Sequence, residues 1–568
     1  MEHTSGAECD VLVIGSGASG MAAALVARHH GLDVLVVEKA AVFGGTTAIS
    51  GGWVWAPGNQ LAATQGIVDG AEAARTYLRA LTGEYFEAER VDAFLESAPR
   101  MIEFFSKNTA VRFACPTTAP DYHAELPGGV QAGRALITEP YDARLLGSYL
   151  EKLHPPLREL TVLGLMLGPG KDVAHFMRAT RSVVSAAYVA RRLARQAFDV
   201  LRYGRGMLLS NGNALAARMA RTALDLGIPV WLSCPGLELV AAERRVTGAM
   251  VEKDGKSIQV RARRGVVLAC GGFTHDEARR KAMFPQIARD NAYASPVPRE
   301  SSGDGVRMAE SHGGWVDTNL AEPAAWVPVS LVPYVDGSRK PFPHFIGRAR
   351  PGVIAVTRRG ERFVNESLSY HDFVRALART CDAEDPAAFL VCDHRSIKRY
   401  GLGIVKPAPF PMTSYVRSGY LYRADTLENL ATQAGIKPAQ FATTVLTFNA
   451  EARYGRDPQF GKGSTHYGRY MGDAMHQPNP CLAPIEVPPF YAVKVVASDL
   501  GTFAGIKTDT KARVLRKSGE PILGLYAVGN DAMSIMGGRY PGAGAVLGSG
   551  MTFGFIAGCH LAGREPSA

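Results

Sequence analysis

The amino-acid sequence predicts an α/β fold in which a discontinuous Rossmann-like domain encloses an inserted α+β domain. The chain has 568 residues, more than one hydrophobic core supports, which predicts two domains. Near its start an apolar strand, a glycine turn, a small-residue helix and a second apolar strand follow one another. Near its end come a further short strand and a glycine-rich helix. The glycine-rich segments thus lie at both ends of a long central part.

The first apolar strand runs into the turn GSGASG, which has the spacing of a dinucleotide-binding motif. Gly15 allows the tight turn, Gly17 lets the backbone approach a pyrophosphate, and Gly20 permits close packing of helix on strand. The helix that follows points free N–H groups and its positive dipole end at the phosphates. The second strand ends at Glu38, 18 residues beyond Gly20, where a carboxylate accepts hydrogen bonds from ribose hydroxyls.

The loop after the second strand favours FAD over NAD. An acid at position 38 indicates a ribose without a 2′-phosphate, which by itself leaves both cofactors open. Residues 43–53 form a glycine-dense loop able to lie flat against a large planar cofactor. No second GxGxxG motif follows a strand, so we expect no built-in NAD(P)H site.

Four further segments carry a family resemblance. Residues 524–531 read as a short strand that ends at a Gly-Asn turn, and residues 540–544 (YPGAG) precede a last small-residue helix. Together with VVLACGGF at 266–273 and RGERFVNE at 359–366, they resemble the fumarate reductase/succinate dehydrogenase flavoprotein superfamily over nearly the whole chain. The resemblance implies that the last helix aims its positive N-terminal end at the flavin.

The resemblance also implies the domain organisation. We expect an FAD-binding domain over residues 1–285 that is rejoined over 488–568, with a substrate-binding, capping domain over 286–487 between them. Within the first part, residues 145–205 read as an insertion. The active site is expected at the domain junction, where closure excludes water.

Two departures from the superfamily pattern narrow the chemistry. Covalent FAD attachment uses a histidine where this chain has Gly45, so we expect FAD to be bound noncovalently. Fumarate reductases place an arginine acid where this chain has Tyr370, and a substrate-binding histidine in a turn that here, at residues 500–505, has none. A dicarboxylate clamp is therefore not expected.

The branch with tyrosine at that position resembles the 3-ketosteroid Δ1-dehydrogenases. These also carry Tyr-Pro-Gly-x-Gly before a Met-Thr-Phe helix, as at 540–544 and 551–553, and Pro-Asp-Tyr ahead of Pro-Gly-Gly, as at 120–122 and 127–129. This chain has Ala-Val-Leu at 545–547 where the family usually has Gly-Thr-Ile.

The implied reaction introduces a C=C bond next to a ketone. A proton leaves the α carbon, a hydride leaves the β carbon for flavin N5, and negative charge develops on the carbonyl oxygen. Two fixed donors at that oxygen lower the barrier by about 3–4 kcal/mol each. The resemblance implies that the Tyr540 hydroxyl and the Gly544 N–H are these two donors. It also implies that Tyr370 is the base that accepts the proton and that Tyr122 relays this proton.

The expected FAD-binding residues come from all these motifs. They are Gly15, Ser16, Gly17, Ala18, Ser19, Gly20, Glu38, Lys39, Gly44, Gly45, Thr46, Thr47, Ser50, Gly51, Gly52, Ala269, Gly271, Asp304, Gly529, Asn530, Gly544, Val546 and Leu547.

The formal net charge of +10 is concentrated in part of the insertion. Residues 171–205 hold eight Lys or Arg against the two acids Asp172 and Asp199, directly after the apolar run 160–167. Two interpretations are open: residues 160–205 contact a membrane surface, or the helix face is solvated and packed on the core. Nucleic acid is not an expected partner, because no recognition motif accompanies the charge.

The remaining composition predicts a cytoplasmic protein, associated with a membrane only if the insertion contacts one. The eight cysteines contain no CxxC pair, which argues against disulfides and zinc, and the fourteen histidines show no metal-ligand spacing. The start of the sequence lacks a secretory signal, and no run of about 18 uncharged apolar residues is present.

The leading hypothesis is FAD-dependent 1,2-dehydrogenation of a lipophilic 3-ketosteroid, with electrons passed to a quinone-type or other acceptor. A flavin ene-reductase, or a dehydrogenase of the 4,5-bond of a 3-ketosteroid, is the enzymatic alternative. The alternative of another class is a noncatalytic flavin subunit that relays electrons within a membrane complex.

Overall fold

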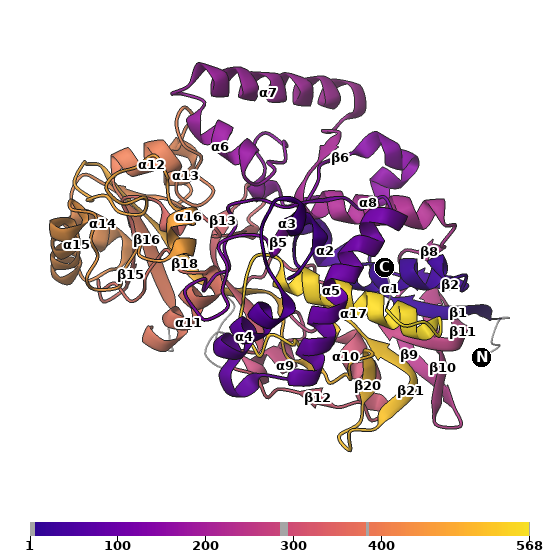
Figure 1. The fold of residues 1–568 in the computed structure, drawn as a ribbon. Coiled ribbons are helices and arrows are strands. Elements are labelled where there is room, and N and C mark those ends of the chain that lie inside the picture. The colour runs from indigo at the N-terminus through magenta and orange to yellow at the C-terminus, as the bar shows by residue number, and fades with distance from the viewer. Residues whose placement is uncertain (1–5, 285–292, 382–385, 567–568) are drawn as a thin grey trace.

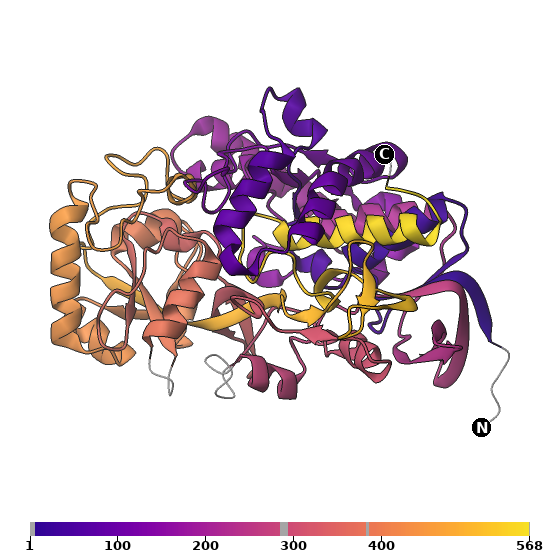
Figure 2. The same cartoon turned by 60° about the horizontal axis from the view of Figure 1, so that its bottom comes forward.

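The computed structural model describes residues 6–284, 293–381 and 386–566, and it shows a mixed α/β protein (Figures 1 and 2). Its largest sheet has eight strands in the order β20 (Arg513–Leu515), β21 (Pro521–Ala527), β10 (Arg245–Lys253), β11 (Lys256–Leu268), β1 (Ala7–Ile14), β2 (Val34–Val37) and β8 (Val230–Trp231), with β9 (Gly236–Ala242) paired to β10. The central strands β21, β11, β1, β2 and β8 run parallel to their neighbours in that series. Strands from both ends of the chain therefore share one sheet.

The strands of this sheet are apolar on both faces because both faces are covered. Val11 and Val13 of β1 belong to a core that includes α1 (Ala18–His29) and α17 (Ala545–Leu561). Leu12 and Ile14, whose side chains alternate with them, belong to the core on the opposite face. Continuous apolar runs are what a doubly covered parallel strand requires.

The first and last long helices pack closely against each other (Figure 1). A Cβ atom at Gly554 of α17 would lie 2.3 Å from the Ser19 carbonyl oxygen of α1, and one at Gly558 would lie 2.7 Å from Val26 Cβ. Glycine at these positions sets the distance between the helices. This packing holds the C-terminal helix beside the glycine turn of β1 and α1.

A second, antiparallel sheet is built mainly by the middle of the chain. Its six strands have the order β14 (Arg339–Pro343), β13 (Ala324–Pro333), β18 (Phe490–Thr502), β16 (Ala387–Cys392) and β15 (Val353–Thr357), with β17 (Tyr422–Ala424) paired to β18. Helices α14 (Leu427–Ala434) and α15 (Pro438–Ala452) cover one face, and α11 (Tyr370–Thr380) packs on β13. β18 follows residue 488, where the sequence analysis expected the return to the first domain. The other expected boundary, 285/286, lies outside the described residues.

Shorter elements surround the two sheets. The small sheets are β3 (Trp53–Trp55), β5 (Ala135–Thr138) and β4 (Phe113–Ala114); β6 (Tyr141–Asp142) and β7 (Leu208–Leu209); and β12 (Val316–Asp317) and β19 (Gly505–Ile506). The other helices are α2 (Gly45–Ile49), α3 (Gln60–Thr64), α4 (Ala71–Thr82), α5 (Ala88–Asn108), α6 (Lys171–Arg178), α7 (Val183–Tyr203), α8 (Asn211–Asp225), α9 (Glu277–Met283), α10 (Asp304–Ser311), α12 (His394–Tyr400), α13 (Thr413–Arg417) and α16 (His466–Met471). The 3₁₀ turns are η1 (Gly83–Tyr85), η2 (Ala143–Lys152), η3 (Arg158–Leu160), η4 (Gly347–Ala349) and η5 (Gly529–Asp531).

The insertion contains the two helices α6 and α7, where the sequence predicted helix over its basic segment. Figure 1 shows α7 at the top of the molecule, and its one substantial contact with another described element is with α6. Phe198 and Leu201 of α7 are 63% and 88% exposed. Within the described ranges, no helix has the length and apolar character needed to cross a bilayer.

Candidate active site

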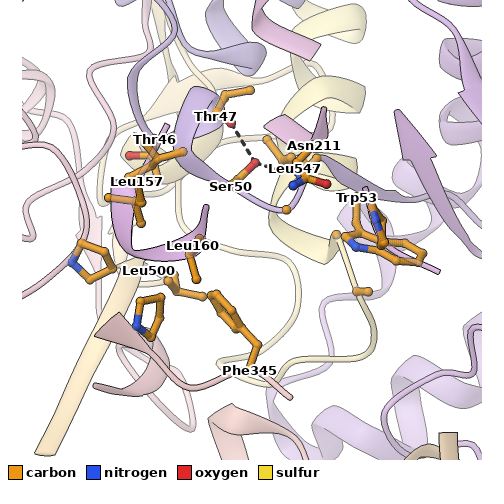
Figure 3. Close-up of a pocket in the computed structure, with 18 of the residues that line it drawn as sticks. Thr46, Thr47, Ser50, Trp53, Leu157, Leu160, Asn211, Phe345, Leu500 and Leu547 are labelled. Carbon is orange, nitrogen blue, oxygen red and sulfur yellow. Dashed lines mark hydrogen bonds between the residues drawn. The ribbon is translucent and has the colours of Figure 1, made fainter. Parts of the chain in front are cut away.

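One cavity of about 1140 Å³ lies where the two parts of the fold meet (Figure 3). Its walls come from the glycine turn after β1, the loop that contains α2, the insertion, the segment around η4, α16, and the approach to α17. Figure 3 shows Leu157 and Leu160 of the insertion near Leu500 and Phe345, with Thr46, Thr47 and Ser50 beyond them. The insertion therefore forms part of the cavity wall and is not a detached surface feature.

The glycine turn gives its three glycines different environments. Gly15 has a φ of 114°, and a Cβ there would lie 2.1 Å from the Ala269 carbonyl oxygen. A Cβ at Gly20 would lie 2.4 Å from the Gly15 carbonyl oxygen, so it packs helix on strand. At Gly17 a Cβ would meet nothing closer than Thr47 Oγ1 at 3.8 Å. The turn thus leaves open cavity beside the first residues of α1.

Glu38 lines the cavity and also holds the turn in place. Its Oε2 atom accepts hydrogen bonds from the Ser16 N–H at 3.0 Å and the Ser16 hydroxyl at 2.6 Å. Its Oε1 atom accepts from the Ala40 N–H at 2.8 Å, which leaves that oxygen one further acceptor site. The bracing of the turn is a role that the sequence motif did not predict.

Two other expected residues are brought together across the fold. The Lys39 ammonium donates to the Ser302 hydroxyl at 2.8 Å and to the Asp304 carboxylate at 2.9 Å. Thr47 Oγ1 accepts the Ala18 N–H at 2.9 Å, so α2 is tied to the start of α1. These contacts join three of the segments that the sequence motifs singled out.

Nearly all the residues expected to bind FAD line this one cavity. Ser16 and Gly44 are the exceptions, because the Ser16 hydroxyl is turned to Glu38 and accepts the Gly44 N–H at 3.0 Å. The cavity-lining members are Gly15, Gly17, Ala18, Ser19, Gly20, Glu38, Lys39, Gly45, Thr46, Thr47, Ser50, Gly51, Gly52, Ala269, Gly271, Asp304, Gly529, Asn530, Gly544, Val546 and Leu547.

Asp531 is a buried residue that the sequence analysis missed. It accepts hydrogen bonds from the Cys270 N–H at 2.6 Å and the Gly272 N–H at 2.9 Å. Burial raises the pKa of its carboxyl to about 6. Asp531 fastens the turn after β11 to the turn after β21, which places the neighbouring Gly529 and Asn530 on the cavity wall.

Three tyrosines from three distant segments meet at the other end of the cavity. The Tyr122 hydroxyl donates to the Tyr370 hydroxyl at 3.2 Å, and the Tyr540 ring lies beside both rings. The ring centroids of Tyr370 and Tyr540 are 5.3 Å apart, and those of Tyr122 and Tyr540 are 5.6 Å apart. Each ring is less than one tenth exposed. We refer to Tyr122, Tyr370 and Tyr540 as the tyrosine cluster.

The environment of the tyrosine cluster keeps its phenols neutral. Burial raises the pKa of Tyr370 well above its ordinary value, and negative charge on Tyr122 or Tyr540 would raise it further. Tyr370 is the first residue of α11, where the helix dipole favours negative charge. The position can therefore support a phenolate, although the resting side chain is protonated at neutral pH.

Gly544 presents its backbone N–H to the cavity. It is the N-cap of α17 with a φ of 88°, and a Cβ there would lie 2.4 Å from the Trp53 carbonyl oxygen. No hydrogen bond joins its N–H to another residue in the parts of the chain that the structure describes. A glycine is thus required sterically, and its donor is open to a ligand.

Two more residues beside the tyrosine cluster were missed. The Tyr467 ring lies 4.5 Å from the Tyr122 ring between centroids. Arg348, which is 1% exposed, donates to four backbone carbonyl oxygens and forms no ion pair within the described ranges. Burial raises the pKa of Tyr467, and the Arg348 charge opposes that rise. Neither residue belongs to a motif, so no sequence signal marks them.

The residues present fit FAD. A Cβ at Gly45 would meet no atom within 4 Å, so the loop borders open space on the cavity side. Glu38 keeps an acceptor site, and the Gly544 N–H has no protein partner where a flavin or substrate would lie. Gly45 has no side chain for a covalent bond to a flavin. No group of three or more possible metal ligands occurs among the described residues.

Comparisons with known proteins give the family. A family profile described as "FAD binding domain" matches residues 10–547. A 4-oxocyclohex-2-ene-1-carboxylate 5-dehydrogenase of Sinomonas cyclohexanicum is 42% identical, with 99% of this chain and 96% of the relative covered. A 3-oxosteroid 1-dehydrogenase of Mycobacterium tuberculosis is 38% identical, with 98% of both covered.

Among solved structures, the 3-ketosteroid Δ1-dehydrogenase from Sterolibacterium denitrificans in complex with 1,4-androstadiene-3,17-dione is 37% identical to this chain. The TM-score is 0.90, and the match covers 98% of this chain and 99% of that one. The chain therefore belongs to the family of FAD-binding flavoproteins and, within it, to the branch that holds the 3-ketosteroid Δ1-dehydrogenases.

Proposed function

We propose that this chain catalyses FAD-dependent 1,2-dehydrogenation of a 3-ketosteroid. The observation that carries the proposal is the meeting of Tyr122, Tyr370 and Tyr540 with the open Gly544 N–H in the cavity that the glycine turns line. These groups can polarise a ketone and remove a proton beside it. Relatives named 3-oxosteroid 1-dehydrogenase at 36–38% identity support the same reaction.

The ketone oxygen is held by the Tyr540 hydroxyl and the Gly544 N–H. Negative charge develops on that oxygen when the α proton leaves, and preorganised donors stabilise it in a site that excludes water. The Gly544 N–H is fixed at the start of α17, whose dipole adds positive potential at the same point. Both donors are thus present before substrate arrives.

The α proton passes to Tyr370. Its hydroxyl oxygen accepts the hydrogen bond from Tyr122, so the developing phenolate has a donor in place. The Tyr467 ring packs on Tyr122 at 4.5 Å between centroids, so Tyr467 is the next phenol along a path for the proton away from the substrate. The Arg348 charge favours negative charge along this path.

FAD is held by the glycine turn with Glu38, by the loop that contains α2, and by the turns around Gly271 and Gly529. When bound, it supplies the acceptor for the hydride. The second sheet and its helices act as the capping, substrate-binding domain, and the Rossmann-like domain consists of the first sheet with its N- and C-terminal strands. Reoxidation by a quinone-type or other acceptor completes the turnover.

A second candidate substrate class comes from two relatives. The 42% identical relative is named 4-oxocyclohex-2-ene-1-carboxylate 5-dehydrogenase, and a 35% identical one is named 4-oxocyclohexanecarboxylate 2-dehydrogenase. Both names describe dehydrogenation of a ring that carries an oxo group, as the steroid enzymes' names do. The tyrosine cluster suits either class, because it acts only on the ring that bears the ketone.

We also propose that the insertion contacts a membrane surface peripherally. Apolar Phe198 and Leu201 are exposed on α7, and basic residues of the same segment suit anionic lipid. The η3 turn of the insertion lines the cavity, so a lipophilic ketone can enter there from the membrane. The chain is otherwise a cytoplasmic enzyme in this proposal.

The test of the proposed reaction is anaerobic mixing of the purified yellow protein with androst-4-ene-3,17-dione while the flavin absorbance is followed. Bleaching together with formation of the 1,4-diene is the expected result. Reduction of a double bond by reduced enzyme would indicate an ene-reductase, and oxidation confined to a saturated ketone's 4,5-bond would indicate the other dehydrogenase. Absence of reaction with any ketone would favour a noncatalytic electron-relay subunit.

A further inference from the structure

One end of the cavity contains a guanidinium that lacks an acidic partner. Arg350 follows η4, is half-buried and lines the cavity. Its guanidinium donates to the Gly472 carbonyl oxygen, and it forms no ion pair within the part of the chain that the structure describes. A guanidinium carries five N–H donors, so several of them have no partner among the described residues.

The acid whose charge acts most strongly on Arg350 is Asp473, which raises the pKa of Arg350 but is engaged elsewhere. Asp473 pairs with Arg399 at 2.6 Å and accepts the Tyr400 hydroxyl at 2.8 Å. The Tyr400 ring centroid lies 5.8 Å from Arg350 Cζ. The positive charge of Arg350 therefore lies near the Tyr400 ring, whereas the neighbouring Asp473 carboxylate forms its ion pair with Arg399.

The energetic cost of this arrangement points to a ligand. A partly desolvated charge is costly unless it is paired and hydrogen-bonded. Burial lowers the pKa of Arg350, which reflects that cost, although the group stays charged at neutral pH. An anionic ligand group in the cavity would supply the missing pair, and the planar guanidinium binds a carboxylate through two parallel hydrogen bonds.

Arg350 and the reacting end line the same cavity and are connected through one short helix. Tyr467 of α16 contacts the tyrosine cluster, and Gly472 at the end of the same helix receives the Arg350 hydrogen bond. A substrate whose ketone lies at the tyrosine cluster therefore shares its cavity with the Arg350 charge.

We propose that Arg350 binds a carboxylate on the substrate, opposite the ketone that the tyrosine cluster holds. The inference rests on the proposed dehydrogenation and specifies its substrate as a cyclic ketone carrying an acid group. A monocyclic 4-oxo carboxylate and a 3-ketosteroid with an acidic side chain share this chemistry. The charge of the acid group, and not only its bulk, determines binding.

The test compares matched pairs of substrates that differ only in charge. The holoenzyme is assayed with 4-oxocyclohex-2-ene-1-carboxylate and its methyl ester, and with 3-oxoandrost-4-ene-17β-carboxylate and its methyl ester. We expect kcat/KM to be about 10- to 100-fold higher for an acid than for its ester, the range for a hydrogen bond to a charged group. The pair with the larger ratio identifies which source of carboxylate the cavity takes.

Variants assign that preference to one residue. Arg350→Gln is expected to abolish the acid-over-ester ratio mainly through a higher KM, and Arg350→Lys to restore part of it. Arg178→Gln is the matched control, because Arg178 is an exposed arginine on the same cavity wall, and it should keep the ratio. Binding of 4-hydroxybenzoate against its methyl ester, measured from the flavin spectrum without turnover, should show the same pattern.

The outcomes separate this inference from the proposed function. Equal use of acids and esters by the unaltered enzyme, or an unchanged ratio in Arg350→Gln, overturns the role of Arg350 while ketone-driven bleaching still supports dehydrogenation. Bleaching by no ketone, acid or ester, overturns the proposed function and the inference with it.

Discussion

Burial sets the protonation states of the individual residues at the reacting end. Burial raises the pKa values of Tyr370, Tyr122 and Tyr540, so each phenol is a donor in the resting protein. A neutral Tyr540 is what a ketone oxygen requires, whereas Tyr370 must lose its proton before it can act as a base. The same burial thus favours one proposed role and makes the other depend on its surroundings.

The variants Tyr370→Phe and Tyr540→Phe test the two roles. Each should leave the protein yellow and folded, because neither hydroxyl is among the expected FAD ligands. The rate of flavin bleaching by a ketone should fall about 10²- to 10⁴-fold without the base and about 10²- to 10³-fold without the donor. Stopped-flow absorbance measures both, and rates equal to those of the unaltered enzyme would refute the assignments.

The expected pH dependence of flavin reduction follows from the raised pKa of Tyr370. Because its pKa lies above about 10, the phenolate fraction rises roughly tenfold per pH unit through neutrality. Anaerobic flavin reduction at saturating ketone should therefore accelerate from pH 7 to 9 without a plateau. Tyr370→Phe should flatten this profile. A plateau reached near pH 7 in the unaltered enzyme would point to a different base.

At the scale of elements, helix starts and turns position the site. Tyr370 begins α11, Gly544 caps α17, and the glycine turn begins α1, so three helix N-termini lie along one cavity. Each brings a positive dipole end to a place where negative charge is expected: phenolate, ketone oxygen and phosphate. The insertion is the element that belongs to neither sheet, and one of its turns, η3, closes the cavity wall.

The proposed membrane contact of α7 is tested by changing its exposed apolar residues. Phe198→Ser with Leu201→Ser should weaken sedimentation of the protein with anionic phospholipid vesicles at least several-fold, because buried apolar area drives interfacial binding. Leu446→Ser, at a 68% exposed position on α15, is the control and should change nothing. Vesicle binding by the α7 variant equal to that of the control would remove the proposal.

At the scale of the whole molecule, two sheets and both ends of the chain enclose one cofactor cavity. Strands β1 and β21 pair with β11 on opposite sides, which carries the first and last glycine motifs to the same edge. The second sheet supplies Tyr370 through α11, and the insertion supplies apolar wall. Most segments that carry a motif therefore border the same space, whereas residues 359–366 do not line the cavity.

We expect FAD to be bound noncovalently in the cavity, which segments from both ends of the chain line. Unfolding in guanidinium should release all of the flavin, and filtration should recover it in the low-molecular-weight fraction. Gly45 offers no atom for a covalent link, which is the reason for this expectation. Yellow colour retained by the denatured chain would show covalent attachment at another residue.

The sequence by itself determined the local chemistry of this protein. The glycines within residues 15–20 are required by the steric limits of a single turn. Such limits can be predicted from the local sequence without knowledge of the rest of the fold. The same holds for Glu38, Gly544 and the tyrosines, which stand in short motifs that the resemblance matched residue by residue. The domain boundaries and the roles of these residues stay predictions.

Only the tertiary structure decided which side chains meet. Tyr467, Arg348 and Arg350 stand in no recognised pattern, and the motif that contains Asp531 does not mark its role. A buried hydrogen bond or a charge without an ion pair depends on neighbours far away in the sequence. The position of a strand is likewise not given by its own residues. β18 lies in the second sheet because it pairs with β13 and β16. Local sterics are encoded in adjacent residues, whereas long-range contacts follow from the packing of the whole chain.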